Sequence, residues 1–127
     1  MVENEKGKAF GEFVQKRRAE LGLSMRKFAE RISINVQYLS NIEYGVQPAP
    51  LHEMLDKIIK GLQLTAEGER EAYDLAAIAR GDKVIAQDAT YYISDNPIVV
   101  RACRTAKDNG VGVAEWERFI AECEKKQ

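Results

Sequence analysis

The stretch from Ser24 to Gly45 constrains the fold of this chain more than any other part of the sequence. Ser24 is a residue type that caps helices, and the apolar residues after it recur at the spacing of one helical face. Only Ser33, Ile34 and Asn35 separate this pattern from a second one, which has Asn35 as its cap and Gly45 as its stop. The sequence therefore predicts two short helices joined by a tight turn.

The second of these helices has an apolar side and a polar side. Leu39 and Ile42 point one way, while Gln37 and Asn41 lie off that apolar line. Because Gln37 and Asn41 are four residues apart, their side chains share one face of the helix. Amide side chains match the hydrogen-bond donor and acceptor on the edge of adenine. This face therefore has the groups to bind a base edge, and the alternative is an ordinary polar helix surface.

The two helices and their turn resemble the helix-turn-helix segment of the Xre/Cro family of bacterial and phage regulators. The resemblance covers roughly residues 10–64, about half of the chain, and rests on Leu23, Ser24, Phe28, Ala29, Glu30, Ile34, Leu39, Ile42, Glu43 and Gly45. One position departs, since Ser33 stands in the turn where the family commonly has Gly. Ser accepts a positive φ less readily than Gly, so we expect slight strain in the turn.

The resemblance implies an all-α fold and roles for individual residues. The fold is a lambda-repressor-like helix-turn-helix domain of four to five helices in residues 1–64, with a C-terminal helical extension in residues 65–127. The residues expected to read bases are Asn35, Val36, Gln37, Tyr38 and Asn41. Those expected to contact the DNA backbone are Arg17, Ser24, Met25, Arg26, Ser40 and Gln47.

The resemblance also implies a structural ion pair between Arg18, in the first helix, and Glu43, at the end of the second motif helix. The alternative is that Arg18 contacts phosphate or water. The charge distribution agrees with DNA binding, although the formal net charge is −1. Residues 1–50 carry eight Lys and Arg against six acids, and residues 51–127 carry eleven against fourteen. The half with the motif is the basic half, as attraction to phosphate requires.

The remaining sequence reads as helical, and no segment of it favours a strand. Further helices are expected at about residues 9–20, 51–62, 66–80, 88–94, 97–109 and 113–125, with residues 1–8 frayed and 81–87 in a loop. The expected core combines Phe13, Phe28, Leu39 and Ile42 with the stripe Leu51, Met54, Leu55, Ile58, Ile59 and Leu62. Such a core is large enough to stabilise a domain of this size.

No catalytic or metal-binding pattern stands out. His52 is the single histidine, and Cys103 and Cys123 lie twenty residues apart, which is not a zinc-binding spacing. The sequence has no glycine-rich phosphate loop, so we expect neither an enzyme nor a cofactor. With no apolar run of about 18 residues and no signal-peptide pattern, we expect a cytoplasmic protein without membrane contact.

These observations predict a sequence-specific regulator that binds double-stranded DNA, namely a repressor acting as a homodimer on a palindromic operator. The dimer is expected to form after Thr65, with Trp116 or Tyr73 near its seam, and a fragment ending at Leu64 is expected to be a folded monomer. In the alternative, the apolar faces of the segment AYDLAAIA and of the last helix, with Trp116, Phe119 and Ile120, pack against one another within a monomer. A second function remains open from sequence: an antitoxin whose C-terminal helices bind a protein partner, the toxin, and whose N-terminal domain autoregulates the pair.

Overall fold

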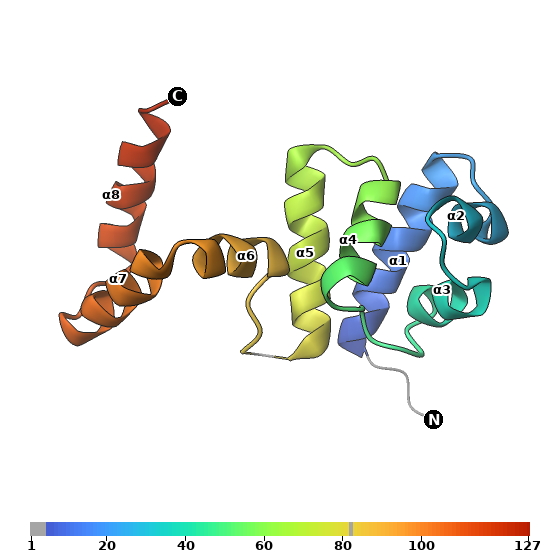
Figure 1. Cartoon of the computed structure of the whole chain (residues 1–127), viewed down its shortest axis with the longest axis horizontal. Coiled ribbons are helices and arrows are strands. Elements are labelled where there is room, and N and C mark those ends of the chain that lie inside the picture. The colour runs from blue at the N-terminus through green and yellow to red at the C-terminus, as the bar shows by residue number, and fades with distance from the viewer. Residues whose placement is uncertain (1–4, 82) are drawn as a thin grey trace. The chain divides into compact units, whose positions relative to one another are not determined.

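The computed structural model describes residues 5–81 and 83–127, and all regular secondary structure in these residues is helical (Figure 1). The helices are α1 (Glu5–Glu20), α2 (Met25–Arg31), α3 (Val36–Glu43), α4 (His52–Gly61), α5 (Ala66–Arg80), α6 (Gln87–Asp95), α7 (Pro97–Asp108) and α8 (Val113–Glu124). This confirms the all-α fold and places the expected elements within a few residues of their predicted bounds.

The N-terminal end of α1 is the main difference from the expected elements. The expectation of fraying was wrong for residues 5–8, which are helical, and residues 1–4 lie outside the described part. The start of this helix is held by packing, since Gly7 and Phe10 are buried. A Cβ atom on Gly45 would lie 3.2 Å from the Cα atom of Lys8, so the loop after α3 covers the first turns of α1.

The described chain divides into two compact units, residues 1–90 and residues 91–127. Helix α5 belongs to the first unit and packs against α1. Its contact face consists of small side chains, with Ala72, Ala76 and Ala79 buried, so the two helices can approach closely. The compact unit that contains the helix-turn-helix therefore also includes α5, and the domain boundary expected after residue 64 stays a prediction.

The core of the first unit is built by α1 to α5. Its largest fully buried side chains are Phe10, Val14, Phe28, Leu39, Ile42, Leu55, Ile58, Ile59 and Leu62. The apolar stripe expected on α4 was wrong at its first residue, Leu51. Helix α4 begins at His52, and Leu51 is an extended N-cap residue that is 44% exposed. Phe13 is only partly buried against this core, and Phe10 and Val14 supply the buried face of α1.

A close contact between α1 and the end of α3 depends on Gly11. A Cβ atom at this position would collide with the main-chain oxygen atoms of Ile42 and Glu43. Because glycine has no side chain, α1 can lie directly on the last turn of α3. This contact fixes the second motif helix to the rest of the first unit.

The second unit contains α7 and α8, joined by a short turn at residues 109–112. The turn is closed by a hydrogen bond from the Val111 amide to the Ala106 carbonyl, at 2.9 Å. No residue between 91 and 127 is buried. On α8, the rings of Trp116 and Phe119 meet edge to face, with their centroids 6.2 Å apart.

Candidate nucleic-acid interface

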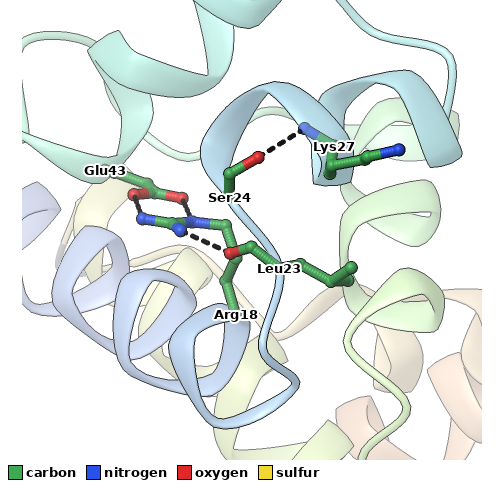
Figure 2. Close-up of polar contacts among 5 residues, drawn as sticks. All are labelled: Arg18, Leu23, Ser24, Lys27 and Glu43. Carbon is green, nitrogen blue, oxygen red and sulfur yellow. Dashed lines mark hydrogen bonds and ion pairs between the residues drawn. The ribbon is translucent and has the colours of Figure 1, made fainter.

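The first motif helix, α2, begins at a capped N-terminus. The Ser24 hydroxyl accepts a hydrogen bond from the Lys27 amide at 3.1 Å, as Figure 2 shows. After α2, the chain passes through Ser33 with a φ of 60°, and the Ile34 amide donates to the Ala29 carbonyl at 2.9 Å. The positive φ at Ser33 confirms that the turn takes the conformation that favours glycine.

The second motif helix, α3, is capped by Asn35. The Asn35 Oδ1 atom accepts from the amides of Gln37 and Tyr38, at 2.7 and 3.1 Å. Its side-chain oxygen is therefore used within the helix, and only its amide NH₂ group is available for another partner. The expected base-reading role of Asn35 stays a prediction, while its capping role is present in the structure.

Three amide side chains form a chain of hydrogen bonds along the exposed face of α3. Gln37 Nε2 donates to Asn41 Oδ1 at 3.1 Å, and Asn41 Nδ2 donates to Gln47 Oε1 at 3.1 Å. The Asn41 carbonyl also accepts from the amides of Val46 and Gln47, which fixes the loop beside it. Asn41 is held on two sides, whereas Gln37 is exposed at the outer end of the chain.

The other expected base readers are less accessible than Gln37. Val36 and Tyr38 are half-buried and pack against the core of the first unit. Burial raises the pKa of the Tyr38 hydroxyl, and the nearby positive charge of Arg80 lowers it by a smaller amount. These two side chains present only part of their surface on the face of Gln37 and Asn41.

The expected contacts to the DNA backbone fall on several elements. Arg26 is exposed on α2, while Met25 before it is half-buried in the core. Ser24 and Gln47 serve in the cap and the amide chain described above, and Ser40 is half-buried on α3. Among the residues expected to contact the DNA backbone, Arg26 has a charged side chain that is exposed on the helix-turn-helix itself.

Arg17 takes a structural position that the sequence did not indicate. Its Nε atom donates to the Leu62 carbonyl at 2.9 Å, and its Nη2 atom donates to the Gln63 carbonyl at 2.8 Å. These oxygen atoms lie just after α4, where a helix leaves carbonyl groups without internal partners. The guanidinium expected at the DNA backbone is thus used to fasten α1 to the end of α4.

The ion pair expected between Arg18 and Glu43 is present and has two parallel hydrogen bonds. Arg18 Nε lies 2.7 Å from Glu43 Oε2, and Arg18 Nη2 lies 2.9 Å from Glu43 Oε1 (Figure 2). The remaining Nη1 atom donates to the Leu23 carbonyl at 2.8 Å. The Glu43 side chain is fully buried, and hydrogen bonding to it raises the pKa of Arg18. The pair joins α1, the loop before α2 and the end of α3.

A second buried polar cluster lies outside this interface, around Gln87. Its side chain accepts from the His52 amide at 2.6 Å and donates to the His52 carbonyl at 3.0 Å and to Asp56 Oδ1 at 3.1 Å. The Tyr73 hydroxyl donates to the same Asp56 oxygen at 2.7 Å. No local pattern marks Gln87, because its partners are more than thirty residues away in sequence.

Within residues 5–81 and 83–127, no cluster of His, Cys, Asp or Glu has the arrangement of a metal site. Among the helices described, none is long and apolar enough to span a membrane. The thiols of Cys103 and Cys123 are exposed and unbridged.

Comparison with known proteins agrees with this geometry. A family model described as helix-turn-helix matches residues 14–68. Two uncharacterized HTH-type transcriptional regulators of Mycobacterium tuberculosis, from strains CDC 1551 / Oshkosh and H37Rv, are each 37% identical over 57 residues. The match covers 45% of this chain and 40% of each relative, so the chain spans well under half the length of these proteins. No solved structure matches significantly. Residues 14–68 thus match a helix-turn-helix domain, in agreement with the resemblance to the Xre/Cro family.

Proposed function

We propose that this chain is a sequence-specific DNA-binding transcriptional regulator. The observation that carries the proposal is the amide chain on α3, where Gln37 is exposed and Asn41 is held in place by Gln47. An exposed amide on the second helix of a helix-turn-helix domain has the hydrogen-bonding groups to read a base edge in the major groove. The similarity to two proteins described as HTH-type transcriptional regulators also supports this proposal.

The proposed contacts divide into those that read bases and those that hold phosphate. Gln37 and Asn41 are the base readers, and adenine is the base that their amide groups match. Arg26 supplies a charged contact to phosphate from α2, next to the cap at Ser24. Contacts of this second kind raise affinity for every sequence, whereas those of the first kind select among sequences.

The regulator acts as a homodimer on a palindromic operator and represses by occupying it, so that polymerase is excluded. One helix-turn-helix domain reads only a few base pairs, and such a contact alone is weak. Two copies related by a two-fold axis would read two half-sites about 34 Å apart, which is one turn of the double helix. No catalytic step is part of this function.

Selection of bound sequences from random double-stranded DNA tests the proposal. We expect the bound pool to converge on an inverted repeat whose half-sites are separated by about one helical turn, ~34 Å. Convergence on a single, non-repeated half-site would leave DNA recognition intact and reject the dimeric operator. A pool that does not converge at all would reject sequence-specific binding.

An antitoxin is the second candidate function, and one observation favours it. Trp116, Phe119 and Ile120 on α8 are exposed apolar side chains that a protein partner could cover. Purification of the chain after co-expression with a small toxin-like reading frame beside its gene tests this function. A stable complex that is lost when residues 91–127 are removed would support it.

A further inference from the structure

The helices of the second unit carry apolar side chains that nothing within residues 91–127 covers. Ile98 on α7 is 67% exposed, and Val113 and Phe119 on α8 are 75% and 59% exposed. A unit of this size with no buried residue has no core of its own, and small units of this kind need an additional source of stability. The uncovered faces of α7 and α8 are therefore suited to an interface.

The two helices carry opposite net charge. On α7, Arg101 lines the apolar face, and Lys107 lies on the same helix, one turn after Cys103. On α8, Glu117 and Glu122 lie on opposite sides of the face formed by Trp116, Phe119 and Ile120. With three basic residues and one acid, α7 has a net charge of +2, and α8, with one basic residue and four acids, has −3.

The face of α7 is also hollowed, and the face of α8 carries aromatic rings. The hollow has a volume of about 380 Å³ and is lined by Ile98, Arg101, Ala102, Thr105, Ala106 and Val111. The lining includes the small side chains of Ala102 and Ala106, which leave space for a larger side chain from outside. Phe119 and Trp116 are exposed aromatic side chains on α8 that can fill such a space.

We propose that residues 91–127 bind the same segment of a second copy of this chain, with α7 of each copy against α8 of the other. The inference rests on the proposed homodimer and names the surface that forms it. A two-fold interface brings each residue pair together twice, so both contacts would join a basic helix to an acidic one. Phe119 of one copy would enter the hollow on α7 of the other, and the four helices would share one core.

Charge favours a second copy over a different partner. A partner with an acidic surface would be attracted to α7 and repelled by α8, and a basic partner would meet the reverse situation. A second copy presents both signs in the arrangement that satisfies both helices at once. Helix α7 against α7 of another copy would instead place Arg101 and Lys107 near like charges.

The test reverses the charges on one helix at a time in the full chain. One variant carries Arg101→Glu with Lys107→Glu on α7, and a second carries Glu117→Lys with Glu122→Lys on α8. We expect each variant alone to have a dimer dissociation constant raised by about tenfold or more, since like charges then face each other at both contacts. Mixing the two variants should restore a dimer that contains one copy of each.

A matched control carries Arg104→Glu with Arg118→Glu. This pair changes the net charge by the same amount as the α7 variant, but Arg104 does not line the hollow on α7 and Arg118 is not one of the exposed apolar side chains of α8. The control should dimerise like the unaltered chain. Analytical ultracentrifugation measures the dimer, and circular dichroism verifies that every variant keeps its helical content.

Three results would overturn the inference: an unaltered chain that is monomeric at tens of micromolar, reversed variants that dimerise normally, or a mixture that stays monomeric. A chain that is monomeric alone and forms a complex with an unrelated protein through this segment would also overturn it. Selection of bound sequences from random DNA, carried out in parallel, separates these results from failure of the proposed function. A chain that selects a DNA sequence without forming this dimer would refute the interface but not DNA recognition. A chain that forms the dimer without selecting a sequence would refute the regulator but not the interface.

Discussion

At the scale of single residues, the amide chain of α3 gives its three members different tasks. Gln37 lies at the exposed end, Asn41 is hydrogen-bonded on both sides, and Gln47 holds Asn41 from the loop. The spacing of Gln37 and Asn41 could be predicted from sequence because it is a local property of a helix. The support from Gln47 could not, because it depends on the path of the chain after α3.

We expect Gln37→Ala and Asn41→Ala each to weaken binding to the preferred DNA site by about 1–3 kcal/mol, with little change on random DNA. Gln47→Ala should weaken specific binding in the same direction, because Asn41 loses the group that orients it. Fluorescence anisotropy with the selected site and with random DNA measures both. Equal losses on the two DNAs would mean that the amides do not read bases.

Arg26 belongs to a different class of contact. Arg26→Ala should weaken binding to all sequences and reduce the slope of log affinity against log salt concentration by about one, because one phosphate contact is lost. Arg104→Ala, an arginine on α7, serves as the control and should leave the slope unchanged. The slope is measured by titration at several salt concentrations, and an unaltered slope for Arg26→Ala would exclude it from phosphate binding.

Arg18 and Glu43 form the ion pair whose loss should affect folding most. Arg18→Ala leaves the buried Glu43 carboxylate without its partner. Breaking a buried pair costs about 3–5 kcal/mol, and we expect the lower end of this range because 11% of the Arg18 side chain is exposed. Replacing both residues with apolar ones should cost less than this single change. Denaturant unfolding of the single and double variants gives the coupling free energy, and a coupling near zero would contradict the pair's role.

At the scale of elements, the turn between α2 and α3 contains the residue that departs from the family pattern. Ser33 has a φ of 60°, a conformation that costs a non-glycine residue about 1–3 kcal/mol. Glycine removes this strain but adds flexibility to the unfolded chain, at a cost of about 0.5–1 kcal/mol. We therefore expect Ser33→Gly to raise the melting temperature slightly, whereas Ser40→Gly, inside α3, should lower it. Calorimetry measures both, and a lowered melting temperature for Ser33→Gly would show that the turn is unstrained.

The elements also show why helices could be predicted more fully than their contacts. Apolar spacing and caps such as Ser24 and Thr65 are local signals, and both caps are present in the structure. The hydrogen bonds of Arg17 could not be predicted, because an arginine on a helix surface gives no sign of carbonyl groups about forty-five residues further along the chain. Its expected contact with the DNA backbone stays a prediction. The buried alanines of α5 show the same limit, since a small apolar face in a sequence fits either a neighbouring helix or a second copy.

At the scale of the whole molecule, the division into units changes the expected effect of truncation. A fragment ending at Leu64 would lose the buried Ala72 and Ala76 as well as the Tyr73 hydrogen bond to Asp56. We therefore expect this fragment to be strongly destabilised, contrary to the expectation from sequence. A fragment of residues 1–90 retains these contacts and Gln87, so it should be a folded monomer with weak affinity for a full operator. Thermal unfolding and ultracentrifugation of the two fragments compare them directly, and a stable fragment 1–64 would contradict this view.

The position of the single tryptophan has a practical consequence. Trp116 lies in the second unit, and 40% of its surface is exposed beside Phe119. Its fluorescence therefore reports on the surroundings of α8. If a second copy covers this face, the emission maximum should move to longer wavelength on dilution, at the same concentration at which the dimer dissociates. The chain thus carries its own optical probe of assembly, and no external label is needed to follow the dimer.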